Sequence, residues 1–262
     1  MTSAQKNPAS ECAKLTSHPM VRDLLKATIP LITNETRAKP LTDADSCNLE
    51  VFDAISSLNQ SFELLERSQS FATLIPSAKY LNGLNINRHD WLEYQVSTFL
   101  ITFVTVSDQA VLLVNDVFCL GIAPKDCKAT VVKNNKWVKD TSIPKQLDAI
   151  KKVIERHCKA RHLLVHEGKT PSLDTLFKSK NFDQLKAISF AVQHAPEKFS
   201  GEFKAKLDES YVKVVIKINK TLDSEICQLR AAVWQLLTDL HKFYSQRLSI
   251  LSGSVASESS TS

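Results

Sequence analysis

The fold is decided by residues 87–120, which read NRHDWLEYQVSTFLITFVTVSDQAVLLVNDVFCL. This stretch contains no glycine or proline, and its apolar residues recur every three or four positions, as on one face of a helix. Asn87 predicts an N-cap, and Gly121, directly after the stretch, predicts the end of the helix. A helix of this length extends about 50 Å at about 1.5 Å per residue, so we expect it to be central to the fold. Its predicted core stripe comprises Trp91, Phe99, Phe103, Val106, Ala110, Leu113, Val117 and Leu120.

Part of this stretch is apolar enough to raise the question of a membrane span. Asp108, Gln109, Asn115 and Asp116 interrupt residues 96–122. An aspartate near the centre of a bilayer costs about 2.5–3.5 kcal/mol. The sequence therefore favours a buried helix of a soluble protein and no membrane segment.

The start of the chain and its cysteines bear on the cellular compartment. The first twelve residues, MTSAQKNPASEC, are polar and lack the apolar segment of a secretory signal. None of the six cysteines belongs to a CxxC pair. We therefore expect a cytoplasmic protein whose thiols are reduced.

The rest of the chain also indicates helices. Five glycines and nine prolines in 262 residues are few for the turns of a β-sandwich or a Rossmann-type fold. Around Asn134-Asn135 we expect a short extended pair, within a loop at 122–142. Periodic apolar spacing predicts further helices over 18–32, from Asp45 to about Pro76, over 142–167, over 173–193, and over 201–251, the last unbroken or broken near 221–224. The predicted fold class is all-α, a helical bundle.

Positive charge is concentrated in one segment. Residues 125–169 contain 12 Lys and Arg against 5 Asp and Glu, a net +7 in a chain of net charge +5. A local basic field attracts polyanions, chiefly nucleic acid, through counterion release. The alternative is that these lysines only form a solvated helix face. The candidate RNA contacts are Lys133, Lys136, Trp137, Lys139, Arg156, His157 and Lys159, with Trp137 placed to stack on a base and with Arg156 and His157 expected at the surface.

The basic segment leads into a short motif, Arg161-His162-Leu163-Leu164-Val165-His166, followed by Gly168 as a helix stop. An arginine can hold a phosphate with its fixed fork of donors, and a histidine can exchange a proton near neutral pH. His162 and His166 are four apart and share a helix face. Arg161 and His166 lie about 140° apart around an ideal helix. These two converge only if the helix frays or if a second chain supplies the complement.

Arg161, His162 and His166 match the pattern Arg, then Asn, Asp or His, then three residues, then His, and here the chain resembles the HEPN superfamily of helical ribonucleases and nucleotide-binding domains. The long helix containing SDQAVLLVNDVFCLG, the basic loop with Cys127 and the helix ending in VHEG are similar to one prokaryotic branch of these proteins. The resemblance covers residues 85–195.

The resemblance implies a metal-independent endoribonuclease without a cofactor. A ribose 2′-OH would attack the adjacent phosphodiester, leaving a 2′,3′-cyclic phosphate and a 5′-OH. His166 would be general base or acid, Arg161 would stabilise the phosphorane, and His162 would orient the substrate or carry a second proton. The implied setting is a toxin or antiviral-defence element that acts on RNA as a homodimer, with an antitoxin or regulatory protein as a further partner.

From these observations we expect a HEPN-like core with additional helices at both ends. The apolar stripes of the helices at 87–120 and 201–251 are expected to supply area for the dimer contact. The expected segments are a flexible arm at 1–14, N-terminal helices at 15–84, the HEPN-like core at 85–195, a C-terminal helical segment packing on the core at 196–251, and a disordered tail at 252–262.

Several alternatives stay open for these residues. His162 and His166 could bind zinc, although no third ligand is obvious. Arg161 and His162 could merely cap carbonyls at the helix end, where cations are favoured. Asp108 and Asn115 could line the motif from the long helix or form a buried polar pair. Cys158 is expected to be a small core residue. The alternative function is a non-catalytic helical RNA- or protein-binding module that keeps the motif at an interface.

Overall fold

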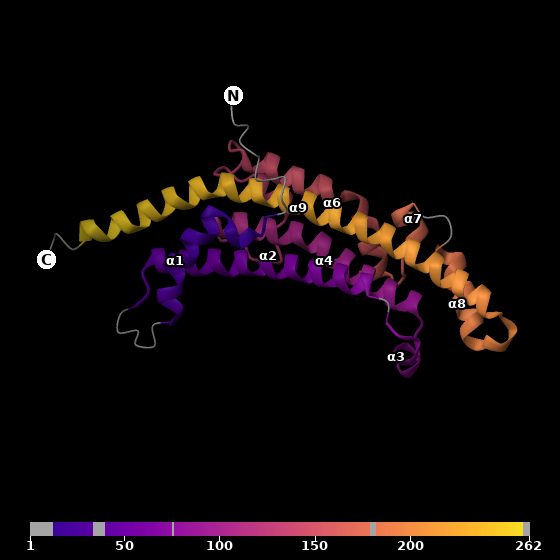
Figure 1. Ribbon diagram of the computed structural model, residues 1–262. Coiled ribbons are helices and arrows are strands. Elements are labelled where there is room, and N and C mark those ends of the chain that lie inside the picture. Colours follow the sequence, from indigo (N-terminus) through magenta and orange to yellow (C-terminus); the bar gives the residue numbers. More distant parts are fainter. Residues whose placement is uncertain (1–12, 34–39, 75, 179–181, 259–262) are drawn as a thin grey trace, which may run out of the picture. The chain divides into compact units, whose positions relative to one another are not determined.

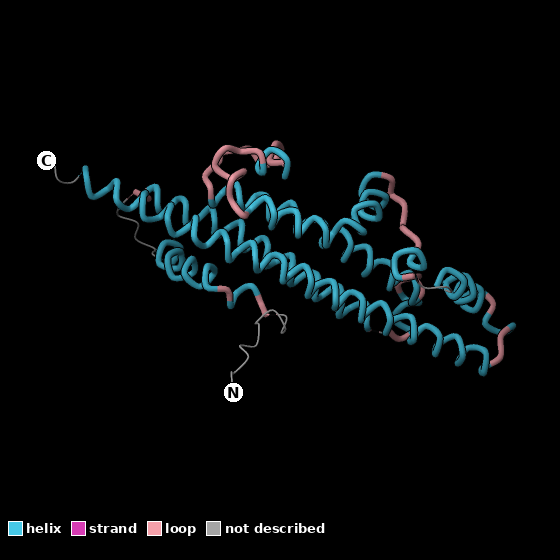
Figure 2. The backbone as a smooth tube through the Cα atoms, turned by 90° about the horizontal axis from the view of Figure 1, so that it is seen from above, coloured by secondary structure: helices cyan, strands magenta, loops and turns pink. Residues whose placement is uncertain are grey.

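The computed structural model describes residues 13–33, 40–74, 76–178 and 182–258 (Figures 1 and 2). These residues form helices joined by turns and loops, with no strand among them, which confirms the all-α class. Most of the expected arm at 1–14 lies outside the described residues. The helices are α1 Pro19–Thr33, α2 Asp43–Thr73, α3 Ala78–Gly83, α4 Arg88–Val117, α5 Ala129–Lys133, α6 Ile143–His166, α7 Leu173–Phe177, α8 Phe182–His194 and α9 Gly201–Glu258, with short 3-10 turns at Leu15–Ser17 and Pro196–Lys198.

Reciprocal side-chain caps explain where the long helices α2 and α4 begin. Thr42 Oγ1 accepts a hydrogen bond from Asp45 N, and Asp45 Oδ2 accepts one from Thr42 N, at 3.1 and 3.0 Å. Asn87 Oδ1 accepts from Asp90 N and Asp90 Oδ2 accepts from Asn87 N, both at 3.0 Å. These are capping boxes, which satisfy amide groups that the first helical turn leaves unpaired. The predicted N-cap at Asn87 is confirmed.

The end of α4 differs from the prediction. The helix stops at Val117, because Cys119 adopts a left-handed conformation with φ of 49°. The turn is closed by Leu120 N, which donates to Asn115 O at 2.9 Å. Gly121 also has a positive φ, 66°, but it lies beyond the turn that ends the helix. A cysteine therefore occupies the position at which glycine is commonest.

The chain divides into two compact units, and α2, α4, α6 and α9 each contribute a segment to both. Unit 1 comprises residues 1–62, 105–153 and 227–262, and unit 2 comprises residues 63–104 and 154–226. In unit 2 the four segments contact one another in a ring, as in a helical bundle. The ring contacts are Trp91 Nε1 to Phe71 O at 3.0 Å, Phe103 with the His157 ring at 5.4 Å, His157 with Glu225 at 3.0 Å, and Gln69 Nε2 to Asn219 Oδ1 at 3.0 Å.

Unit 1 has its own cross-helix contacts. Gln146 on α6 donates to Asp239 on α9, and Tyr244 on α9 donates to Asn48 on α2. The Phe118 ring, just after α4, lies 4.9 Å from the ring of Phe243. The N-terminal segment packs on the same end of α9, since His18 contacts the Trp234 ring and Thr238, while His241 pairs with Asp23. The predicted helix at 18–32 is thus part of this unit.

Three local predictions are wrong. The expected extended pair around Asn134-Asn135 is absent, because 129–133 is helical and Asn134 has φ of −88°, whereas a tight hairpin turn needs positive φ. The expected helix at 173–193 is two helices, α7 and α8, with Lys178 left-handed after the first. The third concerns the tail, because the last helix runs to Glu258 and takes in most of the segment expected to be disordered, with 259–262 outside the described residues. This helix is unbroken at 221–224, one of the two alternatives left open by the sequence.

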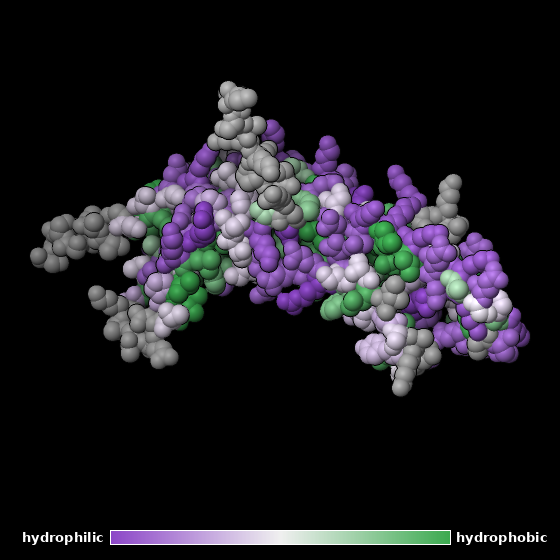
Figure 3. Space-filling view, viewed as in Figure 1, coloured by the Kyte–Doolittle hydropathy of each residue, from purple (hydrophilic) through white to green (hydrophobic). Residues whose placement is uncertain are grey.

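The apolar stripes of α4 and α9 are buried within the chain. Phe99, Phe103, Leu229 and Leu236 are each 0% exposed. The expectation that these stripes supply apolar area for a dimer is therefore wrong. The face shown in Figure 3 is mostly hydrophilic, with hydrophobic residues in separate groups. By length and composition α4 could cross a membrane, but more than half of its most apolar window is buried in the protein, as in a core helix.

His89 is a fully buried ionisable group of unit 2. Its side chain is 0% exposed and lies between the rings of Phe182 and Tyr211, at 5.3 and 5.0 Å. Neither ring nitrogen has a hydrogen-bond partner among the described residues. Burial, with the nearby Arg88 charge, lowers the pKa of His89 to about 4. The imidazole is therefore neutral in the folded protein at neutral pH.

We expect His89→Leu to raise stability at pH 7 by about 1 kcal/mol, because it removes two unsatisfied buried nitrogens. In the wild type His89 binds a proton near pH 6.5 in the unfolded chain but only near pH 4 in the folded protein. The free energy of unfolding therefore falls as the pH decreases through this window. The variant should lose about 2 kcal/mol less than the wild type between pH 7 and 5. Thermal melts at both pH values measure this. The core control Leu100→Ala, a buried residue of α4, should be destabilised equally at both pH values. An unchanged pH dependence in His89→Leu would contradict the assignment.

Candidate functional site at the end of α6

The predicted motif occupies the last turn and a half of α6, in unit 2. The helix runs from Ile143 to His166, close to the predicted 142–167. Gly168 has φ of 62°, which residues with a Cβ rarely adopt. This turn lets Glu167 N and Lys169 N both donate to Leu163 O, at 3.1 and 3.0 Å. The chain therefore leaves the helix directly after His166 and leaves the end of α6 open to solvent.

The two motif histidines lie side by side on the exposed face of α6. The ring centroids of His162 and His166 are 4.9 Å apart, and the His162 side chain is 63% exposed. Glu167 Oε1 lies 3.9 Å from His162 Nε2, and Glu167 also pairs with Lys169 at 2.8 Å. The structure thus brings together two imidazoles and a carboxylate, which are groups able to move protons.

Arg161 lies on a different side of the helix. It follows His157 by four residues, so it occupies the same face as this buried histidine, whereas His166 lies about 180° away from His157. Arg161 is partly buried, and its Nε is enclosed without a hydrogen-bond partner among the described residues. The predicted divergence of Arg161 from His166 is therefore present in the folded chain. One copy of the motif does not surround a phosphate.

The face that carries Arg161 is fixed by a buried acidic residue of α9. Glu225 is 4% exposed and pairs with Arg156, while its Oε2 lies 3.0 Å from His157 Nε2. His157 is 1% exposed, and burial together with the Arg156 charge lowers its pKa to about 4. His157 Nε2 lies 3.0 Å from both Glu225 Oε2 and Arg156 Nε, so in the neutral ring it either donates to Glu225 or accepts from Arg156. The contact holds α6 against α9 one turn before the motif.

These contacts overturn two expectations for α6. His157 was expected at the surface as an RNA contact, but it is a core residue, because Glu225 supplies the polar partner that its burial requires. Cys158 was expected in the core, but it is exposed, because the buried stripe continues from Ile154 to His157 and Ala160. Lys159 is exposed, and Arg156 is half-exposed. The Arg156 guanidinium forms an ion pair with Glu225.

The other candidate RNA contacts belong to unit 1. Trp137 is 64% exposed, with the Lys136 ammonium 4.9 Å from its ring centroid, and Lys139 is exposed near Asp140. Lys133 differs, since its ammonium pairs with Asp148 at 2.6 Å. Of the basic segment, residues 125–153 carry eight basic and three acidic side chains in unit 1, and residues 154–169 carry four basic and two acidic ones in unit 2.

Asp108 and Asn115, the candidate supporting residues from the long helix, also lie in unit 1. Asp108 is exposed. Asn115 is 8% exposed and accepts from Ile122 N at 3.1 Å, while its amide donates to Asp116 at 2.9 Å. With Glu50, Asp53 and Asp116 it lines a cavity of about 400 Å³. Burial, and the charges of Glu50 and Asp53, raise the pKa of Asp116. The contacts of Asn115 close the turn after α4.

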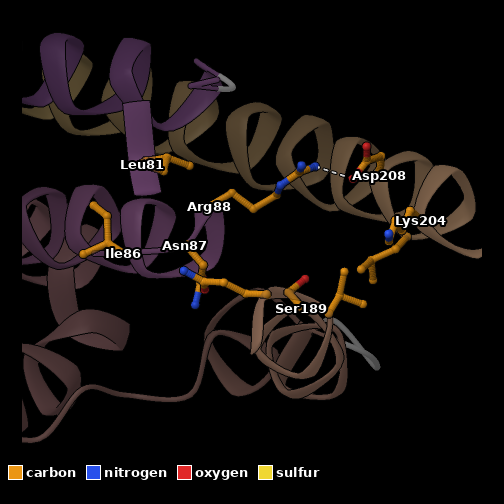
Figure 4. A pocket seen from close by; sticks show the side chains of 10 residues that line it. Leu81, Ile86, Asn87, Arg88, Ser189, Lys204 and Asp208 are labelled. Carbon is orange, nitrogen blue, oxygen red and sulfur yellow. Dashed lines mark ion pairs between the residues drawn. The ribbon is translucent and has the colours of Figure 1, made fainter. Parts of the chain in front are cut away.

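A cavity of about 340 Å³ in unit 2 provides a further hollow, at the start of α4 and α9 and along α8 (Figure 4). Arg88 and Asp208 form an ion pair across one side of it, with Nη1 and Oδ1 2.7 Å apart. Leu81, Ile86 and Leu207 supply apolar lining. None of the motif residues lines this cavity, so the candidate chemistry lies at the exposed end of α6.

Two acidic residues near the motif were missed in the sequence. Glu167 directly follows His166 and is not among the expected site residues. Glu225 carried a clearer signal, because it occupies a core position between Leu222 and Leu229 in the stripe of the last helix. An acid in an apolar stripe requires a buried cation or donor. Among the described residues, no group of three or more His, Cys, Asp and Glu is arranged to hold a metal ion.

More than half of the chain matches the model of one protein family. A family model described as HEPN_Cthe2314-like HEPN matches residues 48–225. The matched region includes the predicted core at 85–195 and extends to α2 on one side and to Glu225 of α9 on the other. Neither the curated proteins nor the solved structures give a match to the chain. The match covers the motif, the helix that carries it and the acid that holds this helix.

We expect Arg156→Met to lower the free energy of unfolding by about 2–4 kcal/mol, because it leaves the Glu225 carboxylate buried without its cation. Adding Glu225→Gln should restore more than half of this loss, since the buried charge is then removed. Urea denaturation measures both effects. The control Lys159→Met, an exposed cation on the same helix, should change stability by less than about 0.5 kcal/mol. If Arg156→Met leaves the free energy of unfolding unchanged, the ion pair with Arg156 is not needed to stabilise the buried Glu225 carboxylate.

Proposed function

Because the chain belongs to the HEPN_Cthe2314-like HEPN family, we propose that it is a metal-independent endoribonuclease. The observation that carries the proposal is the exposed pair of His162 and His166 rings, 4.9 Å apart at the end of α6, with Arg161 on another side of the same helix end. Two imidazoles at this spacing can take and give protons on neighbouring oxygens of one phosphodiester.

The proposed reaction needs one base, one acid and one cation. The base removes the proton from a ribose 2′-OH, whose oxygen attacks the adjacent phosphorus. The bond to the 5′ oxygen breaks, and the acid protonates this oxygen, which leaves a 2′,3′-cyclic phosphate and a 5′-OH. His166 acts as base or acid, and His162 is the second proton carrier, with Glu167 able to orient it. Arg161 stabilises the charge on the phosphorane.

We propose that the complete site is shared by two copies of the chain. Arg161 is partly buried on one face of α6, and His166 is exposed on another, so a two-fold axis at the helix end would supply the missing half of each site. Val165, inside the motif, is 46% exposed and offers apolar surface next to that axis. In unit 2, Leu64, Phe71, Tyr94 and Ile101 are exposed large apolar side chains that a partner copy could cover.

RNA is the proposed substrate, and the exposed Lys136, Trp137, Lys139 and Lys159 are its proposed contacts outside the motif. A phosphate backbone attracts lysines, and an indole with 64% of its surface exposed can stack on a base. The proposed setting is a toxin or antiviral-defence effector in the cytoplasm, held in check by an antitoxin or another regulatory protein.

The alternative function is a non-catalytic helical module that binds RNA or protein through the motif. The enclosed Nε of Arg161 favours it, because a partly buried guanidinium presents fewer donors to a substrate. Cleavage assays separate the two functions.

Wild-type protein should cut RNA in EDTA, because the proposed reaction uses only side chains. Arg161→Ala and His166→Ala should each reduce the cleavage rate at least about 100-fold, in the usual range for a lost acid, base or charge stabiliser. His162→Ala should have a smaller effect. Gel analysis of the fragments and their 2′,3′-cyclic ends measures this. His194→Ala, an exposed histidine of α8, is the matched control, and cleavage that requires a divalent ion would refute the mechanism.

RNA affinity should fall steeply as salt rises, because lysine–phosphate contacts release counterions. The double change Lys136→Glu and Lys139→Glu should weaken binding of unrelated RNAs alike, by about tenfold at 100 mM salt. Filter binding with the catalytically inactive His166→Ala protein avoids cleavage during the assay. Lys242→Glu, a single reversal on the exposed face of α9, should have a smaller effect. A salt-independent affinity would contradict the proposed contacts.

The protein should sediment as a homodimer at micromolar concentration. If the site is shared, mixing inactive Arg161→Ala with inactive His166→Ala should recover part of the activity, because one of the two composite sites in a mixed dimer then keeps a complete set. Val165→Glu should shift the protein toward monomer and abolish cleavage together, since it puts a charge at the proposed axis. A fully active monomer would disprove the shared site.

A further inference from the structure

Two cysteines far apart in sequence meet in unit 1. Cys47 lies in the second turn of α2 and is 4% exposed, and Cys119 lies in the turn after α4 and is exposed. Their Sγ atoms are 4.0 Å apart, although the residues are separated by 72 positions. All five described cysteines carry thiols in this structure. The pair therefore joins a solvent-accessible sulfur to a buried one.

The surroundings of the pair make the two thiols unequal. The Cys47 thiol donates a hydrogen bond to the Cys119 sulfur, and the Arg247 guanidinium of α9 lies beside it, which together lower the pKa of Cys119 to about 6. The same hydrogen bond, together with burial, raises the pKa of Cys47. Glu50 on α2 acts against Arg247 on both sulfurs, and Tyr244 on α9 also faces Cys47. Cys119 is thus the nucleophile, and Cys47 holds its proton.

The backbone conformation at Cys119 is also unusual. Its φ of 49° is a conformation that a non-glycine residue seldom adopts. The turn is held by Cys119 N donating to Asp116 O and Leu120 N donating to Asn115 O, at 3.1 and 2.9 Å. A glycine would form the same turn without strain. The Cys119 side chain makes two contacts, since its Sγ donates to Asp116 O at 3.4 Å within the turn and lies 4.0 Å from the Cys47 sulfur.

We propose that Cys47 and Cys119 are a peroxide-sensitive dithiol that closes to an intramolecular disulfide. The Cys119 thiolate attacks one oxygen of hydrogen peroxide, the O–O bond breaks, and the departing hydroxide takes a proton to become water. Cys119 is now a sulfenic acid. Cys47 then loses its proton and attacks the Cys119 sulfur, so that an S–S bond forms, the S–O bond breaks, and a second water leaves. Two thiols are oxidised and one peroxide is reduced to two waters.

Closure requires the two sulfurs to approach from 4.0 Å to about 2.05 Å. Cys119 is exposed and lies outside the helix, so the movement falls on its side chain and its turn. The disulfide would join the start of α2 to the end of α4 within unit 1.

The test uses the full-length reduced protein treated with a small excess of hydrogen peroxide at pH 7. Remaining thiols are then blocked with a maleimide, and intact mass and peptide mapping are measured. We expect the loss of two thiols and a peptide in which Cys47 is joined to Cys119. Cys158→Ser, which removes an exposed thiol on α6, should oxidise in the same way. Cys119→Ser should leave Cys47 reduced.

A second measurement identifies the order of the steps. Cys47→Ser should stop at a Cys119 sulfenic acid, which a cyclic 1,3-dione traps as a mass adduct. Iodoacetamide should modify Cys119 in the wild type at least about tenfold faster than Cys158 at pH 7, and Arg247→Gln should slow this reaction, whereas Arg247→Lys should largely preserve it. The proposal is overturned if Cys119 is oxidised no faster than Cys158, or if the mapped disulfide joins other cysteines.

Discussion

The buried carboxylate of Glu225 is the contact on which the geometry of unit 2 depends. A charge that is 4% exposed is costly unless it is paired, and Arg156 and His157 on α6 provide that pairing. Because adjacent residues of α6 are bound to one residue of α9, both the rotation and the height of α6 are set at this point. Sliding α6 by one residue would leave the carboxylate buried without partners.

The rotation of α6 decides how the motif is presented. His157 faces inward, so Arg161, one turn later, is drawn toward the same side, and His162 and His166 turn to solvent. The Gly168 turn then ends the helix without covering either ring. A structural ion pair and a proposed catalytic surface are therefore two consequences of one helix orientation. The divergence of Arg161 from the histidines is also the physical reason for the proposed two-copy site, since in the proposed reaction a phosphate contacts both faces.

Buried neutral histidines recur in this protein. His18 in unit 1 and His89 and His157 in unit 2 each have a pKa lowered to about 4, chiefly by burial. In contrast, the motif histidines lie at the surface beside Glu167 and Lys169. Burial thus separates histidines that pack from histidines that can exchange protons with solvent, a separation that residue type alone does not reveal. The dithiol of unit 1 follows the same logic, with one sulfur buried and one accessible.

Short-range sequence patterns predict the all-α class, the Asn87 cap, the course of α4 and α6, the helix stop at Gly168 and the motif that indicates the family. These patterns are informative because capping, apolar periodicity and a glycine turn act within a few residues. Tertiary packing makes His157 rather than Cys158 continue the core stripe, since its partner, Glu225, is 68 residues away. It also decided the end of α4, where Cys119 takes the left-handed position beside Cys47, and the burial of the α4 and α9 stripes within the chain. Each of these outcomes depends on a contact between segments far apart in the sequence. Local residue spacing does not predict which distant residue makes that contact.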